Sequence, residues 1–157
     1  MYYRYQPSPL GPLLLAGDEH GLHLVHMDAM QPWELPDTWQ PADRQLDEVA
    51  RQLDQYFAGQ REHFEVTLAP LGTPFQREVW QALQRIPYGT TCSYAELAQR
   101  IGRPRAVRAV GTANGANPIA IIVPCHRVIG SNGTLTGYAG GVERKQQLLE
   151  LEGAWLI

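Results

Sequence analysis

The apolar positions of the chain follow two different periods, and the change from one to the other divides it. Short apolar or alternating runs in the first 72 residues predict strands at 13–15, 22–27 and 64–68. Apolar residues also recur there at helical spacing, at Leu46, Val49, Leu53 and Phe57. This repeat predicts an amphipathic helix over residues 42–58. The first half is therefore expected to form a small sheet and one helix.

Helices dominate the pattern after residue 72. Capping boxes at residues 73–76 and 93–96 mark the starts of two helices, and Pro104 opens a third. The second and third are joined by a short turn around Gly102, which is typical of a helix-turn-helix motif. Many helix pairs share this pattern without touching DNA, so the motif alone is a weak sign of function.

The last third of the chain adds one buried segment and a closing helix. A continuous apolar run at 119–123, bounded by prolines, predicts a fully buried strand or extended segment. Asn132-Gly133 predicts a tight turn, and residues 142–152 a final helix. We expect an α/β protein of the α+β type, with an N-terminal α/β domain over residues 1–72 and a mostly helical domain over residues 73–157.

Composition excludes several classes of protein. The 157 residues are 44% hydrophobic and 18% charged, which argues against a disordered chain or a coiled coil. No apolar run has the length of a membrane span and no signal-peptide pattern is visible, so a cytoplasmic protein is expected. The two cysteines, Cys92 and Cys125, are too few for a disulfide scaffold.

Charge is distributed unevenly between the two halves. Residues 1–72 carry four Arg against eleven Asp and Glu, and residues 73–157 carry nine Lys and Arg against five Glu. The balances are −7 and +4, which sum to the net charge of −3. Four arginines lie in or beside the helix-turn-helix: Arg100, Arg103, Arg105 and Arg108. They favour a nucleic acid as partner, while an ordinary solvated surface remains the alternative explanation.

The densest chemical signal is the pair Cys125–His126, which follows Pro124. An imidazole can take the proton of a thiol and leave a thiolate nucleophile. Neighbouring residues of a strand point to opposite faces, so the pair can cooperate only if the backbone turns there, and then more readily through a bridging water. A lone cysteine is usually a small buried hydrophobe, so both interpretations stay open at this point.

The segment Pro124-Cys125-His126-Arg127-Val128, preceded by Asn117-Pro118, resembles the active-site signature of a known family. The family is that of the O6-alkylguanine-DNA alkyltransferases, also called methylated-DNA–protein-cysteine methyltransferases, here of the bacterial single-chain type. Further segments match it in order and spacing, at residues 73–80, 86–89, 93–94, 108–111 and 137–141. The resemblance is strong over residues 73–153 and loose over residues 1–72.

The resemblance implies a fold and an activity. The N-terminal domain would be ribonuclease H-like and the C-terminal domain winged-helix-like. The protein would repair DNA by direct reversal, moving the alkyl group of O6-alkylguanine, and of O4-alkylthymine, irreversibly to Cys125, so that each molecule acts once. The target base would be flipped out of a duplex bound through its minor groove. The family implies no cofactor and no metal, and the free protein is expected to be a monomer.

The same resemblance implies roles for the residues around the acceptor. His126 would be the general base that acts on the thiol through a water, and Glu152 would orient and charge the imidazole. A glutamate at the end of a helix is unfavourable against the helix dipole, so a specific partner would explain its place. Asn117 would fix the active-site turn by hydrogen bonds. Tyr94 would hydrogen-bond the flipped guanine and help the leaving base accept a proton.

A second group of residues would bind the base and the DNA. Arg108 would enter the base stack in place of the flipped nucleotide, and Tyr138 would stack on the base in its pocket. Main-chain groups of Cys125, Val128 and Ala139 would read the guanine edges. The other DNA-binding residues expected on the second helix of the motif are Arg105, Ala109 and Gly111. Small residues there suit a shallow groove and suit helix packing equally well.

Three other functions compete with this one. A non-catalytic alkyltransferase-like protein would bind lesions without reacting, but that class lacks the acceptor cysteine. A Cys-His hydrolase would need an oxyanion hole and would turn over. A helix-turn-helix regulator would bind a specific DNA sequence and ignore alkylation.

Three histidines, His20, His23 and His26, superficially resemble a metal cluster. In a strand, their spacing puts His23 and His26 on opposite faces, so ligation is not expected. Some relatives carry zinc in the N-terminal half, but no cysteine precedes Cys92 here.

Overall fold

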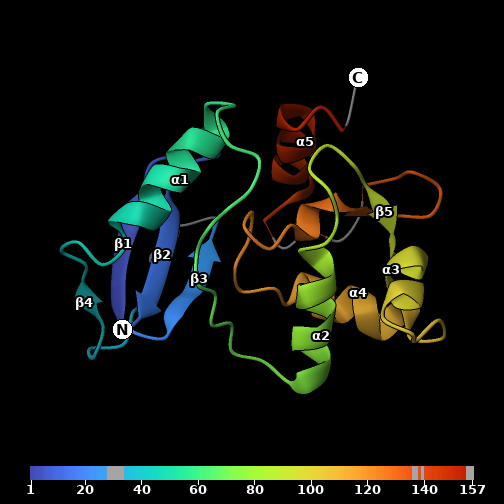
Figure 1. The fold of residues 1–157 in the computed structure, drawn as a ribbon, viewed down its shortest axis with the longest axis horizontal. Helices are drawn as coiled ribbons and strands as arrows, with labels where there is room; N and C mark the ends of the chain where they lie inside the picture. The colour runs from blue at the N-terminus through green and yellow to red at the C-terminus, as the bar shows by residue number, and fades with distance from the viewer. Residues whose placement is uncertain (28–33, 136–137, 139, 155–157) are drawn as a thin grey trace. The chain divides into compact units, whose positions relative to one another are not determined.

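The computed structural model describes residues 1–27, 34–135, 138 and 140–154 (Figure 1). The chain forms two compact units, Met1–Leu71 and Gly72–Ile157. This division lies one residue before the boundary that the sequence predicts. The first unit is a sheet with one helix and the second is mostly helical, which confirms the predicted mixed α/β class. Over the described residues, no helix is both long and apolar enough to cross a membrane.

The sheet of the first unit has the strand order β3-β2-β1-β4. Its strands are β1 (Tyr2–Gln6), β2 (Leu13–Asp18), β3 (Gly21–His26) and β4 (Gln40–Pro41). The first three pair antiparallel, which confirms the strands expected from the two apolar runs, whereas the short β4 pairs parallel with β1 and leaves no signal in the sequence. Leu13, Leu14 and Leu15 of the inner strand β2 are completely buried, although successive side chains of a strand point to opposite faces of the sheet.

Helix α1 (Asp47–Phe57) runs along the sheet of this unit (Figure 1). It begins later than the expected residue 42, because the side chain of Gln45 accepts hydrogen bonds from the backbone N–H groups of Asp43 and Arg44 and holds a turn there. The buried face of the helix consists of Val49, Ala50, Gln52, Leu53 and Tyr56. Its apolar members follow the helical spacing read from the sequence, so the existence of the helix is confirmed.

The strand expected at residues 64–68 is wrong. The segment makes only one isolated bridge, between Leu68 and Leu22. At Glu65 the backbone N–H donates to Oε1 of Gln52 over 2.9 Å, and the backbone carbonyl accepts from Nε2 of Gln52 over 3.1 Å. A side chain of α1 thus satisfies the groups that a neighbouring strand would otherwise bind.

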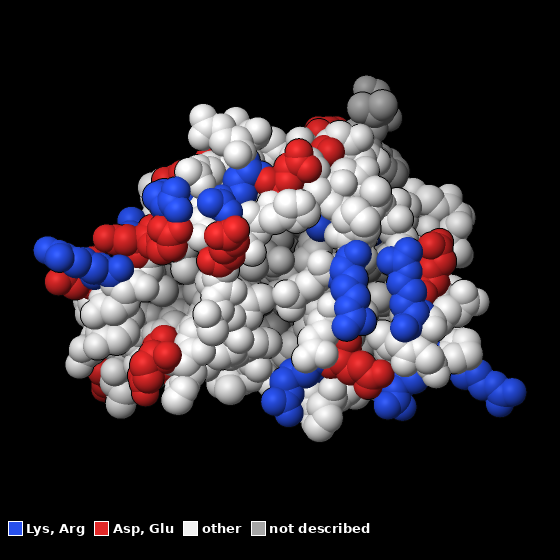
Figure 2. Space-filling view, in the orientation of Figure 1, with Lys and Arg blue, Asp and Glu red and all other residues white. Residues whose placement is uncertain are grey.

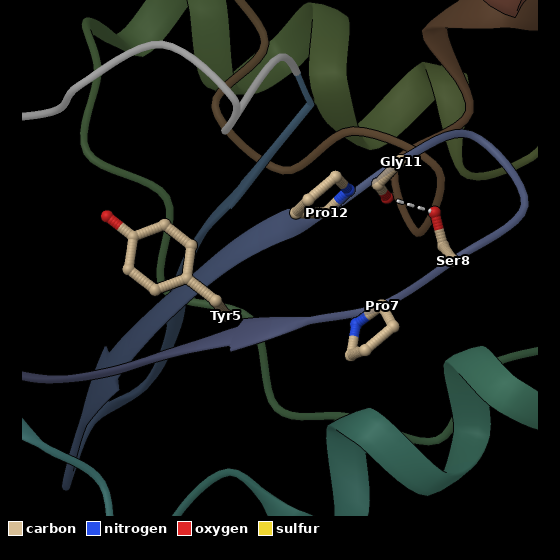
Figure 3. A pocket seen from close by; sticks show the side chains of 5 residues that line it. All are labelled: Tyr5, Pro7, Ser8, Gly11 and Pro12. Atoms are coloured by element: carbon tan, nitrogen blue, oxygen red, sulfur yellow. Dashed lines mark hydrogen bonds between the residues drawn. The ribbon is translucent and has the colours of Figure 1, made fainter.

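The turn between β1 and β2 borders a shallow hollow of about 320 Å³ (Figure 3). Its lining residues are Tyr5, Pro7, Ser8, Gly11 and Pro12. The Ser8 hydroxyl donates to the carbonyl of Gly11 over 2.5 Å, and Gly11 adopts a φ of 99° that favours glycine. All five residues belong to the first unit, whereas the residues expected to carry chemistry belong to the second.

The second unit contains α2 (Pro74–Leu83), α3 (Tyr94–Arg100), α4 (Val107–Gly115) and α5 (Val142–Leu151) (Figure 1). Both predicted capping boxes are present, at the starts of α2 and α3. Helix α4 begins at Val107 and not at Pro104, since the residues before it form a turn. The indole of Trp80 donates to the carbonyl of Ala113 over 2.8 Å and joins α2 to α4. Helices α3 and α4 form the predicted helix-turn-helix.

The apolar run 119–123 is buried as expected, but it is not a strand. The chain turns tightly there, with hydrogen bonds from Ile122 N to Ala120 O and from Val123 N to Ile119 O. Ile121 has a φ of 73°, a strained conformation for a β-branched residue. The side chain of Asn117 accepts from Ile119 N over 3.0 Å and donates to Val123 O over 2.8 Å. These two bonds close the turn in place of a strand partner.

The predicted turn at Asn132-Gly133 is confirmed. Gly133 has a φ of 81°, and its backbone N–H donates to the carbonyl of Gly130 over 2.9 Å. The side chain of Asn132 accepts from Thr134, which fixes the far side of the turn. Asparagine and glycine suit this position because both tolerate turn conformations that other residues avoid.

Candidate active site

A two-stranded parallel pairing brings distant parts of the second unit together. Strand β5 (Cys92–Ser93) pairs with β6 (Val128–Ile129), with Cys92 opposite Val128 and Ser93 opposite Ile129. Ser93 is also the N-cap of α3, so Tyr94 begins that helix directly beside the pairing. Val128 directly follows the turn that carries Cys125. The pairing therefore fixes the start of α3 relative to the Cys-His segment.

Cys125 and His126 lie in a short 3-10 helix, Cys125–Arg127. The backbone thus turns at the Cys-His pair, as cooperation between the two side chains requires. Nδ2 of Asn117 lies 3.1 Å from Sγ of Cys125 and donates to it, while also bonding the carbonyl of Val123. Cys125 is 6% exposed and His126 is fully buried. Asn117 therefore holds both the turn and the sulfur.

Glu152 is the centre of a buried charge network. It lies at the C-terminal end of α5, and its Oε2 is 2.8 Å from Nε2 of His126. Arg127 binds the same carboxylate twice, through Nε at 2.8 Å and through a terminal nitrogen at 3.0 Å. These two partners explain why a glutamate is placed at the unfavourable end of a helix dipole.

Arg127, to which the sequence pattern assigns no role, is a full member of this network. Besides Glu152, its guanidinium donates to the carbonyl of Ile86 over 2.7 Å and lies 5.6 Å above the ring centroid of Tyr88. Arg127 thus contacts Ile86 and Tyr88, two residues of the matched segment 86–89. The sequence signal that could have indicated this role is the position of a basic residue directly after the Cys-His pair, next to a buried apolar run.

The protonation of the network follows from its pKa values. Burial alone would raise the pKa of Glu152, but the hydrogen bonds from His126 and Arg127 lower it to about 2. Burial lowers the pKa of His126, against the opposing effect of Glu152. An ionised carboxylate only accepts hydrogen bonds, so Nε2 of the neutral imidazole carries the proton. Nδ1 then has a free lone pair, and it has no hydrogen-bond partner among the described residues.

The thiol of Cys125 is not ionised at rest. Burial raises its pKa above the ordinary value, while the hydrogen bond from Asn117, the hydroxyl of Tyr138 and the charge of Lys145 act in the opposite direction. Burial also raises the pKa of Cys92. Since burial prevails at Cys125, a nucleophilic role requires a base that removes the thiol proton. The bare Nδ1 of His126, the next residue, is such a base.

Lys145 is a second buried residue for which the sequence pattern predicts no role. It is 0% exposed, on the face of α5 that also buries Leu148, Leu149 and Glu152. Its Nζ lies 6.0 Å from the ring centroid of Tyr94 and 5.9 Å from that of Tyr138. Lys145 lies three residues before Leu148 and seven before Glu152, on the same helix face. A charged residue on this otherwise apolar face is the signal that could have indicated its burial.

The residues expected to contact DNA lie mostly on the surface of the helix-turn-helix. Arg105, Arg108 and Ala109 are exposed, and a Cβ on Gly111 would lie 3.7 Å from the Tyr94 ring. Lys and Arg side chains protrude from this unit on the face drawn in Figure 2. Arg103 pairs with Glu78 over 3.4 Å and lies above the Phe75 ring.

The remaining candidates have mixed positions. Val128 is buried and Tyr138 is half-buried, while Ala139 lies outside the described residues. Within the described part of the chain, no three His, Cys, Asp or Glu side chains come together as a metal site. His23, one of the three clustered histidines, lies 2.8 Å from Asp18 and forms a local pair.

Comparison with known proteins agrees with the geometry of both units. The family model described as 6-O-methylguanine DNA methyltransferase, DNA binding domain, matches residues 74–154. The model of the ribonuclease-like domain of the same family matches residues 1–70. A methylated-DNA–protein-cysteine methyltransferase of Methanosarcina acetivorans is 57% identical over 155 residues, which cover 98% of this chain and 99% of the relative.

Mycobacterial proteins give the same result in sequence and in structure. The methylated-DNA–protein-cysteine methyltransferase of Mycobacterium tuberculosis is 53% identical over 97% of this chain and 92% of its own length. The crystal structure of Mycobacterium tuberculosis OGT in complex with DNA matches with a TM-score of 0.90 at 52% identity, covering 98% of this chain and 93% of that one. The chain belongs to the 6-O-methylguanine DNA methyltransferase family.

Proposed function

We propose that this protein is a methylated-DNA–protein-cysteine methyltransferase, which repairs duplex DNA by moving the alkyl group of O6-alkylguanine to its own Cys125. The observation that carries the proposal is the buried pair of His126 and Glu152 beside the thiol, with Nδ1 of the imidazole bare. A raised thiol pKa makes such a base necessary. Membership in the family, over both units, supports the same reaction.

The reaction is a displacement at the alkyl carbon. Nδ1 of His126 takes the thiol proton through a water, and Glu152 stabilises the imidazolium that forms. The sulfur then forms a bond to the alkyl carbon, the bond from that carbon to O6 breaks, and its electron pair stays on the guanine, which takes up a proton. The product is a thioether. Because thioethers do not hydrolyse under cellular conditions, each molecule acts once and is consumed.

The aromatic residues and Asn117 serve this displacement. The Tyr94 phenol hydrogen-bonds the flipped guanine and helps the leaving base take up its proton. Tyr138 forms the wall on which the base stacks, and main-chain groups of Cys125, Val128 and Ala139 read its edges. Asn117 aims the sulfur, a role that its 3.1 Å contact with Sγ supports.

DNA is the partner of the second unit. The helix-turn-helix of α3 and α4 enters the minor groove, Arg108 replaces the flipped nucleotide in the stack, and Arg105, Ala109 and Gly111 lie along the same surface. The exposure of Arg105 and Arg108 and the +4 balance of this half support the proposal. O4-alkylthymine is a second substrate, and the free protein is a monomer, which sedimentation in the absence of DNA would check.

The decisive experiment is intact-mass analysis after incubation with a duplex that carries one O6-methylguanine. The wild type should gain one methyl group per chain, mapped to Cys125, and then stop. Cys125→Ala should gain none, and Cys92→Ala, which changes the other buried cysteine, should behave as the wild type. Repeated turnover, as a hydrolase would show, or a methyl group on Cys92 would refute the proposal, and so would binding without transfer.

The role of Arg108 has a separate test. Arg108→Ala should slow repair of the duplex lesion by about tenfold or more, because extruding a stacked base costs a few kcal/mol that the inserted side chain repays. Reaction with the free O6-methylguanine base should change little. Arg77→Ala, at an exposed arginine of α2, is the matched control. Equal losses on both substrates would contradict a role in base flipping.

A further inference from the structure

Asn114 is a polar residue in the core of the second unit. It lies in the last turn of α4, on the face that also buries Val110 and Ala113, and is 2% exposed. Its Oδ1 has no hydrogen-bond partner among the residues that the structure describes. An unpaired buried acceptor costs about 1–3 kcal/mol, and native proteins contain few of them. The position of this amide therefore calls for an explanation.

The amide of Asn114 lies against the peptide group that joins Cys125 to His126. Its Nδ2 donates to the carbonyl of Cys125 over 3.5 Å, a long hydrogen bond. The same carbonyl also accepts from the backbone N–H of Val128. Only the nitrogen of an amide can donate to a carbonyl, so this contact settles which end of the side chain is the oxygen. Oδ1 is thus an unpaired acceptor beside the two residues that exchange the thiol proton.

His126 presents a second unpaired acceptor at the same peptide. Because its Nε2 is bound to the ionised Glu152, its Nδ1 carries a lone pair and no proton, and Nδ1 too lacks a partner within the described part of the chain. Two acceptors cannot bind each other, so both need a donor from a third group. The thiol of Cys125 has one hydrogen and can serve one acceptor. A water has two, and buried waters typically make about three hydrogen bonds to otherwise unsatisfied groups.

We propose that Asn114 is a positioning residue for alkyl transfer: its Oδ1 and Nδ1 of His126 together hold the water that carries the thiol proton of Cys125. This inference rests on the proposed function, because the water is the one in that reaction. Before transfer, the water donates one hydrogen to Oδ1 and the other to Nδ1, and it accepts the thiol hydrogen. Sγ itself accepts from Nδ2 of Asn117, which leaves the thiol hydrogen free to point at the water.

The proton moves in two linked steps that leave the water neutral. The thiol proton passes to the water oxygen while the water hydrogen that faces the imidazole passes to Nδ1. The water then donates to the thiolate and accepts from Nδ1–H, and Oδ1 of Asn114 accepts from it throughout. A water held by sulfur and Nδ1 alone could turn its hydrogens away from the imidazole, whereas Oδ1 binds one hydrogen and directs the other to Nδ1. No group has to reorganise when the proton moves.

The test compares Asn114→Leu with the wild type in a thiol reaction that needs no DNA. The rate at which iodoacetamide modifies Cys125 is followed from about pH 6 to about 10 by peptide mass spectrometry, which counts Cys92 separately. Near neutral pH, Asn114→Leu should lose about tenfold or more in reactivity, a part of what a general base contributes. The loss should shrink as the pH rises, because hydroxide then removes the thiol proton without the relay.

The matched control is Val110→Ala, one turn earlier on the same buried face of α4. This change leaves a cavity and no altered amide, so it should lower the melting temperature and keep the wild-type pH profile. Asn114→Leu should melt close to the wild-type temperature, since it buries no unpaired amide and the Cys125 carbonyl keeps its bond from Val128.

The shape of the pH profile separates the relay from a structural role. Asn114→Leu leaves in place the other side chains that act on the pKa values of the thiol and the imidazole: Asn117, Arg127, Tyr138, Lys145 and Glu152. A distorted site would therefore react more slowly at every pH, whereas a lost relay slows the reaction only where the thiol is protonated. A folded Asn114→Leu with the wild-type profile, or with an equal loss at every pH, would overturn the proposal.

A second measurement needs no variant. A high-resolution crystal structure of the unalkylated wild type should show an ordered water within about 3.2 Å of both Oδ1 of Asn114 and Nδ1 of His126. The lack of a water there, or a direct bond from Oδ1 to a protein donor, would overturn the proposal even if Asn114→Leu does not fold. Methyl transfer from the O6-methylguanine duplex should slow in Asn114→Leu in parallel with the thiol reaction. If the wild type itself transfers no methyl group to Cys125, the proposed function fails, whatever the water and the thiol profiles show.

Discussion

The two units of this protein bury different kinds of side chain. In the first unit the buried polar residues are Gln6 and Gln52, and none of its described residues buries a charged side chain. The described residues of the second unit bury six titratable side chains: the two cysteines and His126, Arg127, Lys145 and Glu152. Burial of charge costs folding free energy unless partners compensate it.

The difference separates residues that stabilise from residues that react. An apolar core such as that of β2 and α1 gains free energy from every side chain that leaves water. The charged cluster of the second unit gains less, and its members depend on one another, since Glu152 binds both His126 and Arg127. We therefore expect substitutions in the first core to affect stability alone, and substitutions in the cluster to affect stability and transfer together.

The largest effect is expected for Glu152→Gln. The change leaves Arg127 buried without its carboxylate, and breaking a buried ion pair in this way costs about 3–5 kcal/mol of unfolding free energy. It also removes the charge that stabilises the imidazolium, so methyl transfer per folded molecule should fall, while DNA affinity should be nearly unchanged. Glu150→Gln, at an exposed glutamate of the same helix, is the control. A variant with wild-type melting and a wild-type rate would show that the network is dispensable.

Leu53→Ala tests the other side of the comparison. Leu53 is fully buried in the first unit, and its truncation should lower the free energy of unfolding by about 2–5 kcal/mol. The amount of methyl transferred per folded molecule should not change. Leu71→Ala, at a side chain 74% exposed, should have almost no effect on denaturant unfolding. A loss of transfer in folded Leu53→Ala would mean that the two cores are not independent.

Lowering the pH should destabilise the second unit through buried groups, whose electrostatic interactions salt screens much less than those of exposed groups. The pKa of His126 is lowered in the folded state, so below about pH 6.5 the unfolded chain binds a proton that the folded one does not, and stability falls. Glu152 adds stability above its ordinary pKa of 4.5 that is lost as the pH falls toward about 2. In the first unit Glu48, whose pKa is lowered by Arg51, is exposed, so salt should weaken its effect.

These pH effects can be measured by denaturant unfolding between pH 7 and 3 at low and high salt, followed by hydrogen exchange in each unit. The buried network predicts a loss of protection in residues 72–154 that high salt does not remove. Loss of protection first in the first unit, or at equal pH in both, would contradict this prediction.

The smallest effect is expected for Asp47→Asn. This change breaks the ion pair of Arg4 and Asp47, whose oxygen and nitrogen are 2.8 Å apart but whose side chains are 34% and 60% exposed. Exposed pairs contribute about 0.2–1 kcal/mol, far less than the buried pair of Arg127 and Glu152. Thermal unfolding at low and high salt would check it. A loss as large as that of Glu152→Gln would mean that burial does not separate the two pairs.

Local signals in the sequence determined much of this protein. The capping boxes of α2 and α3, the apolar face of α1 and the turn at Asn132-Gly133 depend on residues a few positions apart, so a reader of the sequence can recognise them. The Cys125–His126 pair and its match to the family also depend on adjacent residues. The family signature led to Glu152 and Asn117, whose contacts with His126 and Cys125 the fold then provides.

Only the tertiary structure decided which apolar or charged segments form strands and which charges are buried. Residues 64–68 and 119–123 both have strand-like composition, yet the side chains of Gln52 and Asn117 bind their backbones and replace a neighbouring strand. From the sequence alone, Arg127 and Lys145 would be expected to lie exposed on the surface, as most Lys and Arg residues do. Their burial depends on partners brought together from α3, the segment after residue 85 and the end of α5, and no local pattern encodes contacts across such separations.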